Sequence, residues 1–431
     1  MDKLDHSHKN GNTSILKDLS SDLNLTEDTI SMILAAGHGK RIKSETSKML
    51  HKVWGVPSVL RVANAAEQGL GSANQIIVVG IKAVDVAKAC SAQAQRSFVY
   101  QASQNGTGHA VKMGLDILGD QAYSGTVYIF PGDIGLLSKQ VVQEFHQAFA
   151  DNACDMMVLT SVFNGDHTDN YYGRVLRVPS TDVHGKPSGD DCDKLIEIIE
   201  HKDILALNAS SPYQVEFHGH TYAFSRQQLL ELREFNTGVF AFKAPSLRTK
   251  INELREDNVQ GELYITDLIS IFNQSDLTVR ASATQDENAV LGFNVKSVLK
   301  HMEDIARAQV YEKLKDIITI VAKDDFFIAE EVVEQILELD AKEGPLDITI
   351  GTGASIGPNV KLSKGVYIGN QVFIENNVEL GPNVRIHKNA LLSTYPDQTL
   401  KIGAGSEIFN GDQIKGNLEI GKNCRIESGV N

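Results

Sequence analysis

The stretch Met32–Lys52, MILAAGHGKRIKSETSKMLHK, decides the fold of the first half of the chain. Its short apolar run ends at Ala35 and is followed by Gly37 and Gly39. Five cations come next: Lys40, Arg41, Lys43, Lys48 and Lys52. A buried strand that ends in glycines lets backbone N–H groups approach an anion, and the cations neutralise its charge. A βα turn with a solvated basic face is the simpler alternative. So dense a cluster in a chain of net charge −14 favours an anion-binding loop.

Short apolar segments alternate with longer amphipathic segments around this stretch. The pattern predicts buried strands at residues 32–35, 75–80 and 126–130, and helices at 58–68, 84–94, 109–117 and 138–149. Alternation of this kind predicts a Rossmann-like α/β domain with a mixed, mainly parallel sheet. A ligand of such a sheet binds at the carboxyl ends of its strands.

Length and composition restrict the possible functions. At 431 residues the chain is too long for one hydrophobic core, so two or more domains are expected. The net charge of −14 argues against nucleic acid or an anionic membrane as a partner. The four cysteines form no C-x-x-C pair, which indicates neither a zinc site nor a disulfide framework and fits a cytoplasmic location. Export and membrane spanning are not expected, because we find no signal sequence and no run of about 18 apolar residues.

Two segments lack a clear pattern. Residues 1–29 are polar, and we expect a loose or weakly helical extension. Residues 180–235 interrupt the alternation of strands and helices, and a long irregular segment is usually functional or disordered. His218 and His220 lie inside this segment, where either a metal site or, more simply, a surface loop would accommodate them.

The carboxyl-terminal part is a hexapeptide repeat. An aliphatic guide residue recurs every six positions from Ile350 to Leu392, and the register resumes from Ile402 to Ile426 after the excursion STYPDQTLK at residues 393–401. This period predicts a left-handed parallel β-helix, a triangular prism filled by the guide residues. With three rungs to a coil, the repeats make about four coils. The connection to this prism is predicted as a long helix from Asn294 to about Lys315.

A second candidate for site chemistry is the segment VYIFPGD, which ends at Asp133. A carboxylate at the carboxyl end of a central strand is well placed to hold a divalent ion between itself and a phosphate. An aspartate that caps the following helix is the alternative. We predict the metal role because the motif accompanies the glycine loop at Gly37.

Taken together, these motifs resemble the N-acetylglucosamine-1-phosphate uridylyltransferases, a family of sugar nucleotidyltransferases. The family's L-A-A-G-x-G-T-R-M loop and P-K-x-L-H segment correspond to residues 34–42 and 47–51 here. Lys40 replaces the family's threonine and Ser47 its proline, while Arg41 and Lys48 keep their spacing. Further matching segments are QNGTGH (104–109), YGRV (172–175), IEHKD (199–203), FNTG (235–238), ELYITD (262–267) and GFN (292–294). The motif resemblance covers residues 30–300.

The resemblance implies a role for particular residues. Arg41 and Lys48 would be the catalytic cations that hold the triphosphate, and Asp133 and Asn294 would bind Mg²⁺. Backbone groups of the glycine-rich segments, together with Gln104, would select the uracil ring, and Gly173, Glu200 and Asn236 would contact sugar and ribose hydroxyls. The complete predicted substrate-binding set is Leu34, Ala35, Ala36, Gly37, Gln104, Gly106, Thr107, Gly132, Gly173, Glu200, Asn236 and Asn294.

The activity implied by the resemblance is transfer of a uridylyl group from UTP to N-acetylglucosamine 1-phosphate, which forms UDP-N-acetylglucosamine and pyrophosphate. The sugar phosphate is itself the nucleophile, so positioning, cations and Mg²⁺ suffice and no general base is expected. A nucleotidyltransferase for another sugar 1-phosphate is an alternative. A non-catalytic, regulatory β-helix assembly is another, although the joint presence of Arg41, Lys48, Asp133 and Asn294 argues against it.

Some family members also transfer an acetyl group in their β-helix. The motifs that the family uses for that reaction, R-P-G, H-x-x-Y-x-G-D and N-Y-D-G, are absent from residues 346–431, and His387 matches none of them. We therefore expect no acetyltransferase activity and a β-helix that packs with copies of itself, as a homotrimer. The predicted domains are the extension 1–29, the nucleotidyltransferase domain 30–300, a helical connector 301–345 and the β-helix 346–431.

Overall fold

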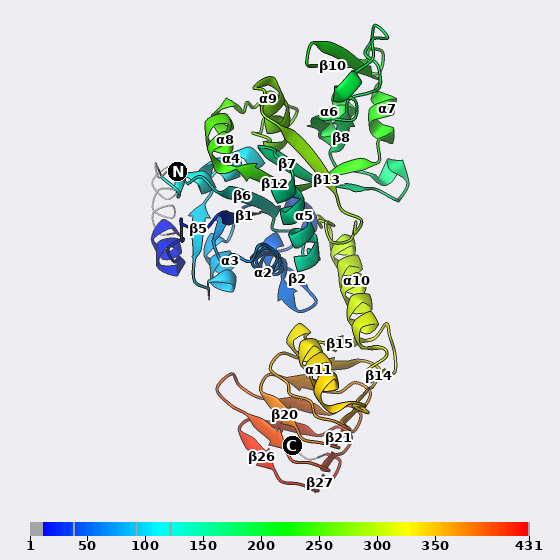
Figure 1. Ribbon diagram of the computed structural model, residues 1–431. Coiled ribbons are helices and arrows are strands. Elements are labelled where there is room, and N and C mark those ends of the chain that lie inside the picture. Colours follow the sequence, from blue (N-terminus) through cyan, green and yellow to red (C-terminus); the bar gives the residue numbers. More distant parts are fainter. Residues whose placement is uncertain (1–11, 38, 92, 120–122, 430–431) are drawn as a thin grey trace. The chain divides into compact units, whose positions relative to one another are not determined.

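The computed structural model describes residues 12–37, 39–91, 93–119 and 123–429. The chain divides into two compact units between Leu299 and Lys300. Figure 1 shows the elements of both units along the chain. No helix among the described residues is long and apolar enough to cross a membrane.

A mixed sheet forms the centre of the first unit. Its main path has the order β13-β7-β12-β6-β1-β4-β5. The bounds are β1 Thr29–Ala35, β4 Gln75–Val79, β5 Arg96–Tyr100, β6 Thr126–Pro131, β7 Met156–Val162, β12 Glu234–Lys243 and β13 Val279–Ala283. All of these strands run in one direction except β12, which pairs antiparallel with both β6 and β7. The predicted mainly parallel sheet is confirmed.

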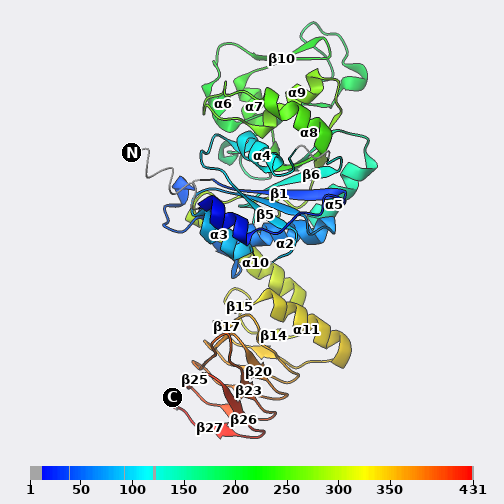
Figure 2. The same ribbon diagram turned by 90° about the vertical axis from the view of Figure 1, so that its left-hand side faces the viewer.

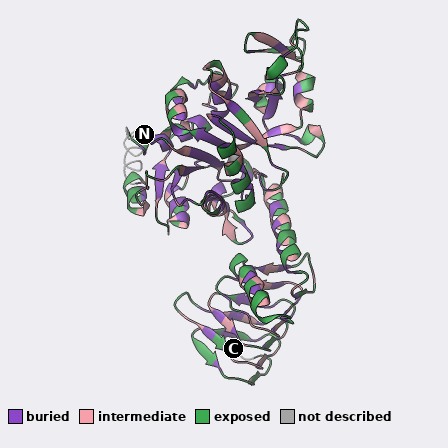
Figure 3. Cartoon of the chain, in the orientation of Figure 1, coloured by how far each residue is buried: buried purple, intermediate pink, exposed green. Residues whose placement is uncertain are grey.

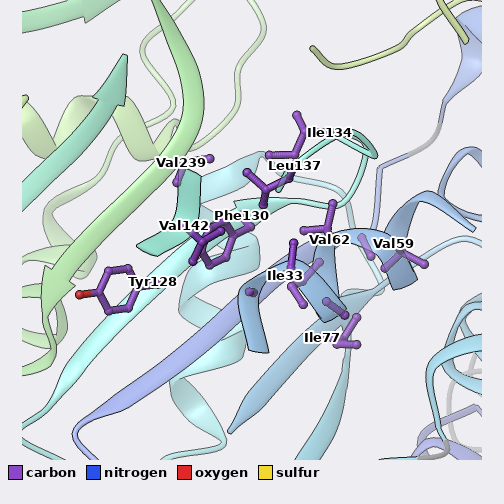
Figure 4. Packing of buried hydrophobic residues seen from close by; sticks show 14 of the residues in the cluster. Ile33, Val59, Val62, Ile77, Tyr128, Phe130, Ile134, Leu137, Val142 and Val239 are labelled. Carbon is purple, nitrogen blue, oxygen red and sulfur yellow. The ribbon is translucent and has the colours of Figure 1, made fainter. Parts of the chain in front are cut away.

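Helices cover both faces of this sheet (Figure 2). One face packs against α2 (Ser58–Leu70), α3 (Ala83–Cys90) and α5 (Lys139–Asp151). The other face packs against α4 (Thr107–Asp116), α8 (Ala244–Lys250) and α9 (Leu268–Gln274). The alternation of side chains along β1 explains this arrangement, because Ile33 points into the first layer and Met32 into the second. Figure 4 shows the first layer around Ile33, Val62 and Phe130.

Part of the predicted amino-terminal extension is packed on this domain. Residues 12–19 are helical, and Leu16 is only 2% exposed within the first core layer. Ser21 N–H donates to the carbonyl of Arg96 at 2.8 Å, and Ser20 Oγ accepts from Phe98 N–H at 3.0 Å. These bonds satisfy backbone groups of the edge strand β5, which would otherwise be open to pairing with another chain. Residues 1–11 of the extension lie outside the described part.

The segment that interrupts the alternation forms a small lobe. Strands β8 (Arg174–Arg177) and β9 (Leu195–Ile199) extend the main sheet, and β10 (Tyr213–Phe217) and β11 (His220–Phe224) form a hairpin. These strands, α6 (His201–Ala206) and α7 (Arg226–Glu231) enclose their own hydrophobic cluster. His218 Nδ1 lies 3.0 Å from Asp191 and His220 Nδ1 lies 2.8 Å from Asp182. Within the described residues no group of three or more histidine, cysteine or acidic side chains is arranged to hold a metal ion.

The second unit consists of helices followed by short parallel strands. Helix α10 (Lys296–Leu314), which begins in the first unit, agrees with the predicted long helix. Residues 317–341, which lie in the predicted helical connector 301–345, form β14 (Thr319–Ile320), β15 (Phe326–Ile328) and most of α11 (Glu330–Glu343). Three sheets contain these strands, with the orders β14-β16-β18-β21-β24-β27, β15-β17-β19-β22-β25 and β20-β23-β26, and from β18 onward successive strands enter the three sheets in turn. The remaining strands are β16 Thr349–Ile350, β17 Ala354–Ile356, β18 Tyr367–Ile368, β19 Phe373–Glu375, β20 Val378–Leu380, β21 Arg385–Ile386, β22 Leu391–Ser393, β23 Leu400–Ile402, β24 Glu407–Ile408, β25 Gln413–Lys415, β26 Leu418–Ile420 and β27 Arg425–Ile426.

The register of these strands follows the guide residues. Ile350 pairs with Ile368 and Ile368 with Ile386, a separation of 18 residues that equals three hexapeptides. Ile386 then pairs with Ile408, because the coil that contains the excursion is four residues longer. These four isoleucines are fully buried. Figure 3 colours the chain by burial and shows buried, intermediate and exposed residues following one another along this part. Parallel strands in three sheets are compatible with the predicted β-helix.

Candidate active site

The loop after β1 places one cation in the interior and leaves others at the surface. Lys48 is only 7% exposed, whereas Arg41, Lys43 and Lys52 are exposed. Gly39 has φ +57°, and a Cβ there would lie 2.7 Å from Lys48 Cβ. Glycine is therefore required both for the backbone conformation and for the close passage of the lysine stem. His38 and the side chain of Lys40 lie outside the described part.

Lys48 joins the two predicted metal ligands. Its Nζ forms an ion pair with the Asp133 carboxylate and donates a hydrogen bond to Asn294 Oδ1 at 2.8 Å. Asp133 follows the end of β6, while Asn294 lies just before α10. Three residues from distant parts of the sequence thus converge on one point at the carboxyl end of the sheet.

The surroundings of this point are fixed by close packing. Gly132 N–H donates to the Leu34 carbonyl at 3.0 Å, and this bond ties the turn after β6 to the end of β1. The ring of Phe293, which is fully buried, lies 5.6 Å from Lys48 Nζ. A Cβ on Gly292 would approach the Asp133 carboxylate to 3.6 Å, so the chain passes close to it. Phe293 and Gly292 therefore position Asn294 beside Asp133.

The chemistry of these groups suits a hard divalent cation. A carboxylate and an amide oxygen are the donors that Mg²⁺ prefers, and Mg²⁺ usually takes one or two carboxylates from the protein and further ligands from substrate phosphates. Asp133 and Asn294 meet this requirement, because both reach the same Lys48 Nζ. The site fits a metal that is held jointly by the protein and by phosphates.

The second glycine-rich segment lies beside the first. A Cβ on Gly80 would be 2.5 Å from the Ala36 carbonyl and 2.9 Å from Gln104 Nε2, so this glycine lets the two loops meet. Gly106 has φ +100° and passes close to Leu263, where an added Cβ would lie 2.4 Å from the carbonyl. Thr107 Oγ1, predicted to contact substrate, accepts a hydrogen bond from Ile265 N–H at 3.1 Å.

The three predicted sugar contacts also come together. Asn236 N–H donates to the Gly173 carbonyl at 2.9 Å, and a Cβ on Gly173 would lie 3.0 Å from Glu200 Oε1. The Asn236 side chain hydrogen-bonds to Glu200. Burial, and secondarily the negative charges of Asp203 and Asp267, raise the pKa of the Glu200 carboxyl to about 7. A carboxyl group that titrates near neutrality is typical of a binding or catalytic cleft.

Two further residues of this region, Tyr172 and Asp267, were not among the predicted site residues. The ring of Tyr172 stacks on Phe235 with centroids 4.4 Å apart. The pKa of the Tyr172 hydroxyl is raised, chiefly by burial and then by the charge of Asp133. Asp267, at the end of ELYITD, has a pKa raised to about 6 by burial and by neighbouring aspartates. Its motif indicated a place near the sugar, whereas nothing local in the sequence identified the aromatic stack.

Comparison with known proteins defines the class. Residues 31–239 match the MobA-like NTP transferase domain, and they contain the loop after β1 and all the proposed site residues except Asn294. The chain is 28% identical over 360 residues to the bifunctional protein GlmU of Caldanaerobacter subterraneus. The aligned residues cover 79% of this chain and 69% of that protein. The GlmU proteins of Corynebacterium aurimucosum and Streptomyces griseus are 32% and 31% identical, over 77% and 79% of this chain.

The chain is therefore similar to nucleotidyltransferases, in agreement with the resemblance of its motifs. More particularly, it is a relative of the bifunctional GlmU proteins. The match spans about two thirds of the length of these relatives, namely 69%, 62% and 64% of the three proteins.

Proposed function

We propose that the protein is a Mg²⁺-dependent uridylyltransferase that forms UDP-N-acetylglucosamine and pyrophosphate from UTP and N-acetylglucosamine 1-phosphate. The observation that carries this proposal is the convergence of Lys48, Asp133 and Asn294 at the end of the sheet. The set of Gly173, Glu200 and Asn236 lies in the same unit and offers hydrogen-bonding groups to a hydroxylated ligand.

The reaction needs no nucleophile from the protein. A phosphate oxygen of the sugar phosphate attacks the α-phosphorus of UTP, a new P–O bond forms, and the bond between the α-phosphorus and the bridging oxygen breaks. Negative charge moves onto the departing pyrophosphate. Lys48 would neutralise that charge from its buried position, and Arg41 would reach the phosphates from the loop surface. When bound by Asp133 and Asn294, Mg²⁺ would supply further neutralisation and hold the phosphates in line.

Base and sugar would be selected in separate regions. Gln104 can both donate to and accept from the edge of a uracil ring, and the backbone of Gly106 gives a flat base room to approach. The ionised Glu200 would accept hydrogen bonds from sugar hydroxyls, with Asn236 beside it as a donor. Leu34 to Gly37 and Gly132 would contribute backbone groups near the phosphates.

The experiment is pyrophosphate release by the purified protein in Mg²⁺. UTP, ATP, CTP and dTTP are each offered with N-acetylglucosamine 1-phosphate, glucose 1-phosphate and N-acetylgalactosamine 1-phosphate. Turnover confined to UTP with N-acetylglucosamine 1-phosphate supports the proposal. Preference for another nucleotide and sugar phosphate would leave the mechanism in place and change the assigned substrate. No turnover with any combination would favour the non-catalytic regulatory assembly instead.

For the second unit we propose a left-handed parallel β-helix that associates as a homotrimer and transfers no acetyl group. Its support is the 18-residue register and the burial of the guide residues. His387 stacks on Phe409 with ring centroids 4.7 Å apart and lies 3.6 Å from the Glu407 carboxylate, so its ring is engaged in packing between rungs. Incubation with acetyl-coenzyme A and glucosamine 1-phosphate should release no thiol, and clear release would refute this part.

A further inference from the structure

Lys48 occupies the position at which the two proposed metal ligands meet. Its ammonium group contacts the Asp133 carboxylate and Asn294 Oδ1, and its side chain is 8% exposed against 18% for that of Asp133. A divalent cation bound by Asp133 and Asn294 would take Asn294 Oδ1, the one oxygen of that side chain, and a carboxylate oxygen of Asp133 beside the ammonium group, at the short distances of about 2.0–2.1 Å that Mg²⁺ requires.

Lys48 and a divalent cation cannot share these oxygens. Two positive charges within a few ångströms of each other repel strongly where water is largely excluded. The lysine also has little freedom near its backbone, because Gly39 passes against its Cβ. Only the distal end of the side chain can move, and the phosphates of a bound nucleotide offer the ammonium group a new partner.

We propose that Lys48 competes with the divalent cation for Asp133 and Asn294, and that the nucleotide phosphates relieve this competition by drawing the ammonium group away. This inference rests on the proposed function, since it takes Asp133 and Asn294 as the metal ligands. The consequence is that metal and triphosphate bind cooperatively, and that a free divalent ion binds the protein weakly. A lysine that assists the reaction therefore also opposes binding of the metal on its own.

The test measures binding of Mn²⁺, as a probe for the metal site, by calorimetry of the full chain without nucleotide. Lys48→Met should bind Mn²⁺ at least about tenfold more tightly than the wild type, because the competing cation is gone. Lys52→Met, which removes an exposed lysine from the same segment, should bind Mn²⁺ as the wild type does. Lys48→Gln is a second neutral variant of similar size, and circular dichroism establishes that each variant is folded.

A second readout follows the lysine itself. Chemical acetylation of lysines is quantified by mass spectrometry in the free protein, with Mn²⁺, and with Mg²⁺ and UTP together. Mn²⁺ should raise the modification rate of Lys48 several-fold by releasing it, and UTP with Mg²⁺ should lower that rate by covering it. The rate at Lys52 should not respond to Mn²⁺.

The outcomes separate this inference from the proposed function. Equal Mn²⁺ affinity of the wild type and Lys48→Met, with binding abolished by Asp133→Asn in both, would overturn the competition and leave the metal site intact. Weaker Mn²⁺ binding by Lys48→Met would overturn it as well. Failure of every protein to bind Mn²⁺ would overturn both the competition and the assignment of Asp133.

Discussion

Glu200 shows how burial changes the pKa of a common side chain in the proposed sugar site. Its carboxyl group lies beside Gly173 and Asn236, and desolvation raises its pKa to about 7. A carboxyl group accepts hydrogen bonds from hydroxyl groups best in its charged form. Because the folded pKa is near 7 and not near 4.5, a large part of this group is protonated just below neutral pH.

We therefore expect kcat/KM for the sugar phosphate to fall as the pH is lowered through about 7. The profile should flatten in Glu200→Gln, whose KM for the sugar phosphate should rise about tenfold or more through loss of a charged hydrogen bond. The Glu231→Gln variant, which changes an exposed residue of α7, is the control. An unchanged profile in Glu200→Gln would show that another group is responsible, such as the substrate phosphate.

Alanine substitutions at Gly39, in the loop after β1, and at Gly71, at the end of α2, form a matched pair. Both have positive φ, +57° and +64°, so alanine strains either backbone by about 1–2 kcal/mol. An added Cβ at Gly71, which ends α2, meets no atom within 4 Å, whereas at Gly39 it meets the stem of Lys48 at 2.7 Å.

Gly39→Ala should lose more unfolding free energy than Gly71→Ala, because only its added Cβ clashes with a neighbour. Only Gly39→Ala should also lose turnover, by about tenfold or more, because it displaces Lys48. Urea unfolding and pyrophosphate release measure the two quantities. Equal turnover in the two variants would mean that the loop tolerates a shifted lysine.

The packing of residues 12–25 at the edge of the sheet can be tested by mutation. Leu16→Ala should lower the free energy of unfolding by about 2–5 kcal/mol, because Leu16 is 2% exposed in the core. Ile15→Ala removes a side chain that is 42% exposed and should cost less than about 0.5 kcal/mol. Similar losses for both, in denaturant unfolding, would show that this segment does not pack as described.

The elements that sequence reasoning predicted well are those with a strong period. Strands at 75–79 and 126–131 and the helix at 58–70 lie within two or three residues of their predicted bounds, since apolar side chains there match one secondary structure only. Segment 317–341 was assigned only to the helical connector, whereas two strands of two or three residues precede a helix there. Residues 180–235 were predicted as a long irregular segment, since the pairing of the hairpin there depends on contacts with its own small core.

In the site, the motifs identified residues whose chemistry is explicit, such as Asp133 and Lys48. They did not indicate that these two side chains contact each other, because that contact depends on how β6, the loop after β1 and the segment before α10 are brought together. The predicted cluster of five cations likewise included residues that lie at the surface, such as Lys43 and Lys52. Spacing alone cannot tell which cation turns inward.

Because the chain divides into two compact units, we expect that a mutation can unfold part of the second unit and leave turnover by the first unit intact. Ile386→Asp places a charge among fully buried guide residues and should unfold the coil around it and abolish the proposed trimer. Lys388→Asp alters an exposed residue of the same coil and should do neither. Sedimentation gives the oligomeric state, and pyrophosphate release should persist in both variants if the first unit acts by itself.

The most direct test of the account compares pyrophosphate release from UTP and N-acetylglucosamine 1-phosphate, in Mg²⁺, by the wild type and by Asp133→Asn. The variant keeps the size of the side chain and removes the charge that a divalent cation needs. We expect rapid release by the wild type and a loss of at least about a hundredfold in the folded variant. Near-normal release by folded Asp133→Asn would contradict the assignment of this carboxylate as the metal ligand, and with it the proposed mechanism.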